Sequence, residues 1–338
     1  MSFQTISVRQ ESLPWSWPLR LGAQMPQNRL RAVITAWDSE GRRHEAELAP
    51  CPGVHPENLE EALGQWHRQV ETLLTANAFA PERWNWTRPA FGLLDLPSGL
   101  FRSVLTAVEQ LLLSLAQAEH PEEFSLPAAV MMEGSALLAL QADAEKGWQE
   151  FLQLWGAGFR VFKCKVGRLP ARHEYDLLQR MNVHAAGHLR LRLDANRGMD
   201  QEGLHFWQSH QASLPIAYWE EAAGLRPQAL DETLWDDDAA GSEAAAWILK
   251  PTRLGLSRTI ALLKDAANQG IPCVLSNAFD SGLSLRASAW IYAAFCANPQ
   301  PLGYGTTRFL PADSWDSETW GRAEVLIPRH PFSQGKDA

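Results

Sequence analysis

Residues 160–166 read Arg-Val-Phe-Lys-Cys-Lys-Val and are followed by Gly167. The apolar residues and the glycine predict a buried β-strand over this range. Because side chains alternate along a strand, Lys163 and Lys165 lie on one face. Two ammonium groups held close together depress each other's pKa, which suits one of them to act as a base. The alternative is an edge strand whose two lysines are simply solvated.

Several other apolar runs also end in charged residues. They are residues 189–194 with Asp194, residues 216–220 with Glu220 and the adjacent Glu221, and residues 246–250 with Lys250. Charges are costly inside an enclosed parallel strand, so their place at the strand ends is informative. In a β/α barrel, the carboxyl ends of the strands form the active-site face.

The segments around these strands predict an α/β barrel. Helical patterns cover residues 144–155, 172–186, 201–211, 257–268 and 283–297, and further strands are predicted at 128–132, 272–276 and 302–304. Repeated βα units predict a parallel sheet, and their number favours a closed barrel. No GxGxxG or GxxxxGKS motif follows a strand, which counts against nucleotide-binding folds. We assign the barrel to residues 125–307.

The first third of the chain has a different pattern. Two strands, 30–37 and 43–48, flank a turn at 38–41, and helical periodicity covers 56–74 and 102–118. We therefore predict an α+β domain over residues 1–124, with residues 308–338 packing back on it.

Composition excludes several classes of function. The chain has 338 residues, 46% of them hydrophobic, and a net charge of −9 without any basic run, which argues against nucleic-acid binding. We find no signal-peptide pattern and no apolar stretch long enough to span a bilayer. The four cysteines form no CxxC pair, so we expect a cytoplasmic protein without a disulfide framework.

The acidic strand ends suggest a metal site. Asp194 offers a hard oxygen ligand of the kind that Mg²⁺ prefers, and it shares a strand face with Arg192 and Asn196. Glu220 and Glu221 point to opposite faces, so at most one faces the barrel axis. Each of these acids alone is equally well explained as a capping or solvated residue. Their combination on successive strands is what favours a site.

Several segments together resemble the enolase superfamily and, within it, the o-succinylbenzoate synthases of menaquinone and phylloquinone synthesis. The likeness covers nearly the whole chain in the right order. The matching segments are 162–167 (FKCKVG), 191–197 (LRLDANR), 219–221 (WEE), 230–234 (LDETL), 248–252 (ILKPT), 276–283 (SNAFDSGL) and 46–53 (AELAPCPG).

The resemblance implies an enolase-type modified β/α barrel with an α+β capping domain. It also implies that three carboxylates bind Mg²⁺, or another divalent ion such as Mn²⁺, namely Asp194, Glu220 and Asp231. Lys165 would be the base, Lys163 would tune it, and Lys250 would stabilise an enolate from across the site. A lysine base acting together with Mg²⁺ is a known pairing in this superfamily. Candidate substrate-binding residues are Arg192, Asn196, Ser276 and Asn277.

The implied function is that of a lyase. It would dehydrate 2-succinyl-6-hydroxy-2,4-cyclohexadiene-1-carboxylate, a small-molecule carboxylate, to o-succinylbenzoate through a metal-stabilised enediolate. A racemase, epimerase or cycloisomerase, for example an N-acylamino acid racemase, uses the same intermediate and is the alternative. Dipeptide epimerases carry Asp-x-Asp after the last strand, where this chain has Gly303-Tyr304-Gly305. A non-catalytic relative is a third possibility.

One connection departs from the family pattern. Residues 222–227 are too few for a helix, because a βαβ crossover needs roughly 10–12 residues for the connection alone. Either the fourth helix is lost or Asp231 is not a ligand, in which case Asp236, Asp237 or Asp238 takes its place. We prefer Asp231. We also expect the Pro-Gly-rich loop at 51–56 to lie over the barrel mouth.

Overall fold

The computed structural model describes residues 2–16, 27–140, 143–231, 244–310, 320–330 and 332, with the side chain of Pro81 excepted. Its largest sheet is parallel and curled, with the strand order β11-β10-β9-β8-β7-β6-β5. The strands are β5 (Ala136–Ala139), β6 (Val161–Lys165), β7 (Arg190–Asp194), β8 (Ile216–Glu220), β9 (Gln228–Leu230), β10 (Ala246–Leu249) and β11 (Cys273–Leu275).

The two edges of this sheet are joined by residues 302 and 303. Gly303 forms a parallel bridge with Ser276 after β11, and Leu302 forms one with Gly134 before β5. The predicted last strand at 302–304 is therefore reduced to isolated bridges. Backbones approach closely here, because a Cβ on Gly305 would lie 2.5 Å from the backbone nitrogen of Leu137. A side chain at Gly305 would not fit this packing.

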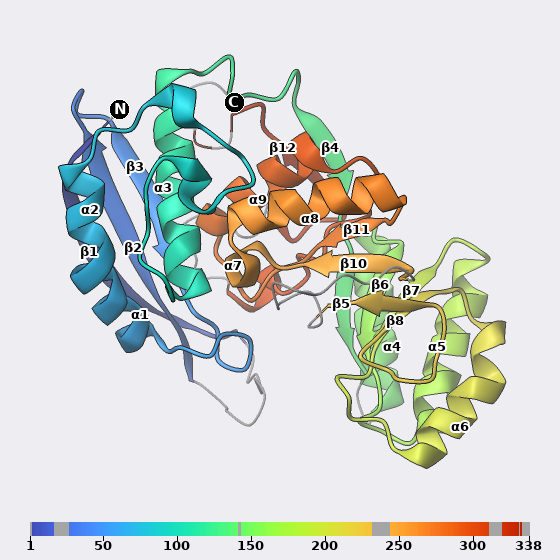
Figure 1. Ribbon diagram of the computed structural model, residues 1–338. Coiled ribbons are helices and arrows are strands. Elements are labelled where there is room, and N and C mark those ends of the chain that lie inside the picture. The colour runs from blue at the N-terminus through green and yellow to red at the C-terminus, as the bar shows by residue number, and fades with distance from the viewer. Residues whose placement is uncertain are drawn as a thin grey trace.

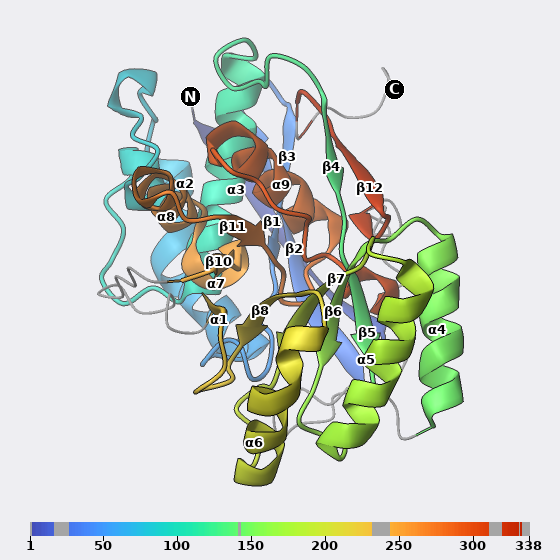
Figure 2. The ribbon, with the colours of Figure 1, turned by 90° about the vertical axis from the view of Figure 1, so that its right-hand side faces the viewer.

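Helices cover the outside of the curled sheet, as the βα pattern predicts (Figures 1 and 2). They are α4 (Ala144–Gly156), α5 (Ala171–Ala185), α6 (Gln201–His210), α7 (Pro251–Leu254), α8 (Leu256–Gln269) and α9 (Gly282–Phe295), with short 3₁₀ turns at Gln211–Ser213 and Thr307–Phe309.

No helix connects β8 to β9, as residues 222–227 predict. The two strands pair directly, with Trp219 opposite Gln228 and Glu220 opposite Ala229. The short connection still buries apolar surface, because Leu225 is fully buried. A Cβ on Gly224 would lie 3.6 Å from Leu204 of α6, so this neighbouring helix packs against the connection.

The N-terminal domain is a three-stranded antiparallel sheet with helices on one side. Its elements are β1 (Phe3–Pro14), β2 (Asn28–Asp38), β3 (Arg43–Leu48), α1 (Leu59–Gln65), a π-helical turn (Trp66–Val70), α2 (Glu71–Ala76), 3₁₀ turns at Pro81–Arg83 and Pro89–Gly92, and α3 (Arg102–Glu119). The sequence did not predict β1. Most of its residues are exposed or half-buried, so they lack the apolar alternation that marks a strand.

Residues near the C-terminus return to the linker between the two domains. Strand β12 (Glu324–Ile327) pairs antiparallel with β4 (Val130–Glu133). Beyond it, the backbone nitrogen of Phe332 donates to the Gln117 side chain near the end of α3, 3.2 Å away. None of the helices in the described ranges combines the length and the apolar character that a bilayer-spanning segment needs.

Helix α3 lies between the N-terminal sheet and helices α7–α9 (Figure 1). One continuous apolar core joins this domain to the half of the barrel formed by β10, β11, α8 and α9. A second core fills the half under α4–α6.

Two buried carboxylates of the N-terminal domain bind the first turns of barrel helices. Glu109 of α3 accepts from the backbone nitrogens of Leu256 (2.5 Å) and Ser257 (3.2 Å), at the start of α8. Glu47 of β3 accepts from the nitrogen of Ser281 (3.0 Å), just before α9. Acceptors at a helix N-terminus satisfy free N–H groups and complement the helix dipole. These contacts position the helices that follow β10 and β11.

The pKa of Glu109 leads to a prediction about stability. Burial raises this pKa from 4.5 to about 7, although the N–H groups of α8 oppose the rise. Between pH 4.5 and 7 the folded protein keeps a proton that the unfolded chain releases, so stability falls as the pH rises through this window. The loss is about 3 kcal/mol. Between pH 4.5 and 8, the free energy of unfolding of the wild type should fall by about 3 kcal/mol relative to that of Glu109→Gln.

Urea denaturation at several pH values measures this difference. Glu60→Gln is the control, because it makes the same substitution at an exposed helical glutamate outside the core. A difference between Glu109→Gln and wild type that stays constant from pH 4.5 to 8 would contradict the raised pKa.

Candidate active site at the carboxyl ends of the barrel strands

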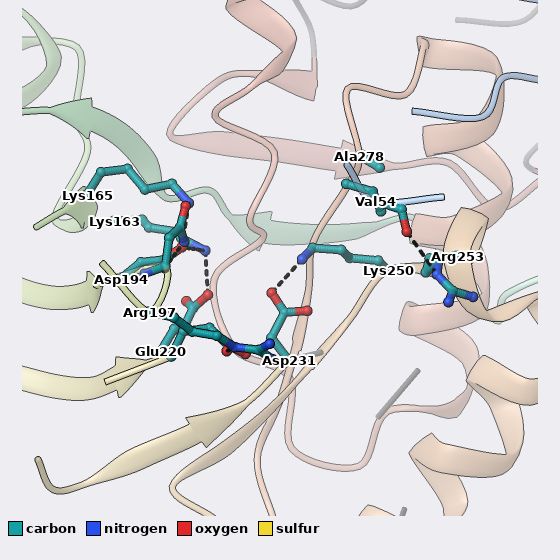
Figure 3. A network of polar contacts seen from close by, with 12 residues as sticks. Val54, Lys163, Lys165, Asp194, Arg197, Glu220, Asp231, Lys250, Arg253 and Ala278 are labelled. Atoms are coloured by element: carbon teal, nitrogen blue, oxygen red, sulfur yellow. Dashed lines mark hydrogen bonds and ion pairs between the residues drawn. The ribbon is translucent and has the colours of Figure 1, made fainter. Parts of the chain in front are cut away.

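Strand β6 turns its two lysines into the barrel. Phe162 and Cys164 are fully buried in the core under the outer helices, whereas Lys163 and Lys165 point to the opposite face. Lys163 pairs with Glu220 and with Asp194 at 2.8 Å, and Lys165 pairs with Asp194 at 2.6 Å (Figure 3). The alternative of two solvated lysines on an edge strand is therefore wrong, because β6 lies between β5 and β7 and both lysines contact buried acids.

The two lysines have different electrostatic surroundings. Burial lowers the pKa of Lys163, but Asp194 and Glu220 raise it more, so it lies well above its usual value. Burial and the Lys163 ammonium together bring the pKa of Lys165 below its usual value. Burial also raises the pKa of Asp194, yet both lysines overcome this and leave it lowered. The pKa of Glu220 is raised by burial despite its pairing with Lys163.

Asn196 holds Asp194 and Lys165 in place. Its backbone nitrogen donates to the carboxylate of Asp194 at 3.0 Å, its side-chain amide donates to the same oxygen, and its Oδ1 accepts from Lys165 at 2.9 Å. Asn196 has a positive φ of 43°, a conformation that asparagine tolerates better than most residues. The Asp-x-Asn spacing is thus part of a local turn that orients the carboxylate.

Lys250 approaches from the other side of the barrel. It follows β10 and pairs with Asp231, which follows β9. Figure 3 shows Lys250 reaching toward Asp231 from the side opposite Lys163 and Lys165. The two groups of charges thus face each other across the strand ends.

Of the three candidate metal ligands, Asp194 ends β7, Glu220 ends β8 and Asp231 follows β9, and each is almost fully buried. Within the part of the chain that the structure describes, however, no three acidic, histidine or cysteine side chains converge closely enough to surround one metal ion. Ammonium groups contact the carboxylates instead. The ligand set therefore stays a prediction, and the alternative ligands Asp236, Asp237 and Asp238 lie outside the described residues.

Two observations bear on the fit of this set to a divalent cation. Asp231 Oδ1 is buried without a hydrogen-bond partner among the described residues, and a lone buried carboxylate oxygen is costly. Glu221 pairs with Arg197 at 2.6 Å, whereas Glu220 is the member of the pair that contacts Lys163. A set of hard carboxylate oxygens suits Mg²⁺.

The candidate substrate-binding residues occupy different levels of the barrel. Asn196 lies beside Lys165, as described. Ser276 and Asn277 follow β11 and are buried, and Asn277 accepts a hydrogen bond from Thr306. Arg192 lies two residues before Asp194 on the same strand face and lines a cavity at the other end of the strands.

The loop at 51–56 contacts the segment that follows Lys250. His55 Nδ1 accepts from the Cys51 nitrogen at 3.0 Å, so Nε2 carries the proton and donates to the Thr252 carbonyl at 2.8 Å. Burial lowers the pKa of His55, which favours this neutral form. Arg253 donates to the Val54 carbonyl at 3.0 Å. The loop thus lies against the Lys250 side of the site.

Arg29 is a positioning residue that the sequence did not reveal. Its buried guanidinium donates to the carbonyls of Phe279 (3.1 Å), Pro50 (2.6 Å) and Ala49, and so joins the loop before Cys51 to the segment after β11. No sequence signal marked it, because an arginine beside Leu30 at a strand start is usually exposed.

Comparisons with known proteins find synthases similar in sequence and enzymes similar in fold. No family model matches the chain. O-succinylbenzoate synthase from Pasteurella multocida is 27% identical over 278 residues, which is 75% of each chain. O-succinylbenzoate synthase from Citrobacter koseri is 26% identical over 306 residues, covering 82% of this chain and 85% of the relative.

Solved structures show the same fold. The substrate-liganded L-Ala-D/L-Glu epimerase from Bacillus subtilis superimposes with a TM-score of 0.75 at 16% identity and covers 98% of both chains. A dipeptide epimerase from Methylococcus capsulatus, complexed with Mg and a dipeptide, has a TM-score of 0.69 at 18% identity and covers 93% of both. The relatives and the fold together confirm the resemblance seen in the sequence: this chain has the enolase-superfamily fold and is a homologue of the o-succinylbenzoate synthases.

Proposed function

We propose that this protein dehydrates 2-succinyl-6-hydroxy-2,4-cyclohexadiene-1-carboxylate to o-succinylbenzoate, a step of menaquinone or phylloquinone synthesis. The observation that carries the proposal is the layer of buried charges at the strand ends: Lys163 and Lys165 with Asp194 and Glu220 on one side, and Lys250 with Asp231 on the other. The synthase relatives supply the choice of substrate.

Lys165 would carry the proton transfers. Its neutral amine takes the proton from the ring carbon next to the carboxylate, so that a C–H bond breaks and the electrons move toward the carboxylate. The C–O bond to the ring hydroxyl then breaks, and the Lys165 ammonium returns the proton so that water leaves. Asn196 holds the lysine for both transfers through its 2.9 Å hydrogen bond.

The other charged residues would stabilise the negative charge that develops on the substrate carboxylate. Lys163 stays protonated between Asp194 and Glu220 and keeps both in place. Lys250 contributes positive charge from the opposite side. Asp194, Glu220 and Asp231 would hold Mg²⁺, which when bound supplies a strong positive charge beside the carboxylate oxygens.

A racemase acting on N-acylamino acids is the second candidate. Lys165 and Lys250 reach the site from opposite sides (Figure 3), and two bases on opposite faces of a substrate carbon are what an exchange of configuration requires. Structures of the same fold include epimerases.

A direct assay tests the proposal. The purified protein with MgCl₂ is given the cyclohexadiene carboxylate, and the aromatic product is followed by its ultraviolet absorbance. We expect Mg²⁺-dependent product formation that EDTA stops and added Mg²⁺ restores. In parallel, N-succinylamino acids in D₂O report α-proton exchange by NMR.

Each result of this assay has a defined meaning. Proton exchange with racemisation but without dehydration would replace the proposal by the second candidate. Absence of both reactions, in a protein that circular dichroism shows to be folded, would indicate a non-catalytic relative.

A further inference from the structure

A cavity of about 130 Å³ lies at the end of the barrel opposite the candidate active site. Its walls include the first residues of several barrel strands, whereas Lys165, Asp194 and Glu220 are the last residues of theirs. Arg190, Arg192 and Tyr218 are among the residues that line it. Barrel interiors are usually filled by packed side chains, so a polar space here needs an explanation.

Arg192 brings a positive charge to this cavity without a counter-charge. The residue is only 3% exposed. Within the described ranges its one hydrogen bond goes to Ser135 Oγ at 3.3 Å, its guanidinium lies over the Tyr218 ring at 5.5 Å, and no carboxylate forms an ion pair with it. A buried guanidinium with a single neutral acceptor is costly, because it has lost its hydration and several of its donors are unmatched.

Tyr218 adds a second unsatisfied group to the same wall. Its hydroxyl is buried and has no hydrogen-bond partner among the described residues. A hydroxyl donor and a guanidinium from two residues that line the same cavity favour a negatively charged ligand. Arg190, at the mouth, is half exposed and pairs with Glu133 at 3.0 Å, so its charge is already balanced. The unmatched donors are therefore those of the buried residues Arg192 and Tyr218.

The charges above the cavity do not neutralise Arg192. Asp194 lies two residues further along the same face of β7, but its carboxylate already pairs with Lys163 and Lys165. Glu220 pairs with Lys163. None of the ion pairs that Asp194 and Glu220 form involves Arg192, so its charge has no carboxylate partner among the described residues. The cavity is the place where a further negative charge fits.

We propose that this cavity binds a small monoanion, a halide or formate, between the Arg192 guanidinium and the Tyr218 hydroxyl. The volume accommodates such an ion together with a few waters. The ion would complete the charge balance beneath the active-site layer and would be distinct from the substrate, which the strand ends on the other side would bind. The site does not depend on which reaction the enzyme catalyses.

Bromide is the probe for the first experiment. Crystals of the full chain soaked in sodium bromide should show an anomalous peak within roughly 3.5 Å of Arg192 nitrogens and the Tyr218 oxygen, the range of hydrogen bonds to large acceptors. Water alone in the cavity, without an anomalous signal, would overturn the proposal.

Thermal unfolding in a bromide series at constant ionic strength, without metal or substrate, gives the second test. Bromide should raise the Tm of wild type by mass action. Tyr218→Phe keeps the ring and removes the donor, so the apparent Kd for bromide should rise at least fivefold. Arg192→Gln should abolish the effect. Arg172→Gln, which removes an exposed arginine paired with Asp176, should respond like wild type.

The two variants keep the test decisive even if one of them does not fold. If Arg192→Gln fails to fold, Tyr218→Phe still decides the matter, because it changes a single atom. Equal bromide responses in wild type and Tyr218→Phe would contradict the proposed site. Because neither readout uses turnover, a failure of the proposed dehydration would leave this result intact, and the reverse also holds.

Discussion

Replacing Lys165 with alanine is expected to lower kcat for dehydration by about 10³-fold or more while the fold stays intact. A positioned general base contributes roughly 10²–10⁴-fold, and Lys165 would serve as base and then as acid in the same turnover. The variant should fold, because Asp194 keeps its 2.8 Å ion pair with Lys163 and so is not left as an unpaired buried charge. Steady-state kinetics and circular dichroism measure the two properties.

Two further variants make this experiment specific. Lys165→Arg keeps the positive charge but cannot release a proton near neutral pH, so it should be as inactive as the alanine variant. Lys146→Ala removes a lysine whose side chain is 72% exposed, and it should behave like wild type. Turnover within tenfold of wild type in Lys165→Ala would rule out Lys165 as the base.

Replacing Asp231 with asparagine is expected to raise the Mg²⁺ concentration for half-maximal activity by on the order of 100-fold. Loss of residues that only support metal ligands typically costs 10–100-fold in affinity, so loss of a ligand should cost at least as much. The substitution keeps the side-chain shape and an oxygen for Lys250, which limits the effect on folding. Isothermal titration with Mg²⁺ measures the affinity directly.

Glu221→Gln is the matched control. Glu221 is adjacent to Glu220 but pairs with Arg197 and not with the lysines of the site, so its replacement should leave the Mg²⁺ requirement unchanged. An unchanged Mg²⁺ affinity in Asp231→Asn would remove Asp231 from the ligand set. The assignment would then move to the run Asp236–Asp238.

Most of the fold follows from local sequence patterns. The predicted helices and the strands from 160 to 276 match the structure within one or two residues at most ends, because their apolar periodicity is strong. The missing helix between β8 and β9 was predictable for a simple reason: six residues cannot hold one. That Lys163 and Lys165 lie on the same face of their strand follows from strand alternation alone.

Local patterns predict the wrong burial for residues at the contact between the domains. In β2, Arg29 and Arg31 are buried and Leu30 is 51% exposed, which reverses the usual rule. Leu30 extends the apolar face of the strand beyond the edge of its own core, while Arg29 meets carbonyls from segments 20 and 250 residues away in the sequence. Such partners are brought together only by the complete fold.

The sequence by itself determined which strands end in charged residues and on which face of each strand these residues lie, because strand periodicity and chain order are local properties. Only the tertiary structure decided that Lys165 and Lys250 face each other, that Glu47 and Glu109 bind the first turns of barrel helices, and that Arg192 lines a separate cavity. These contacts depend on barrel curvature and on the docking of the N-terminal domain. Both arise from packing between residues far apart in the chain, which no local pattern encodes.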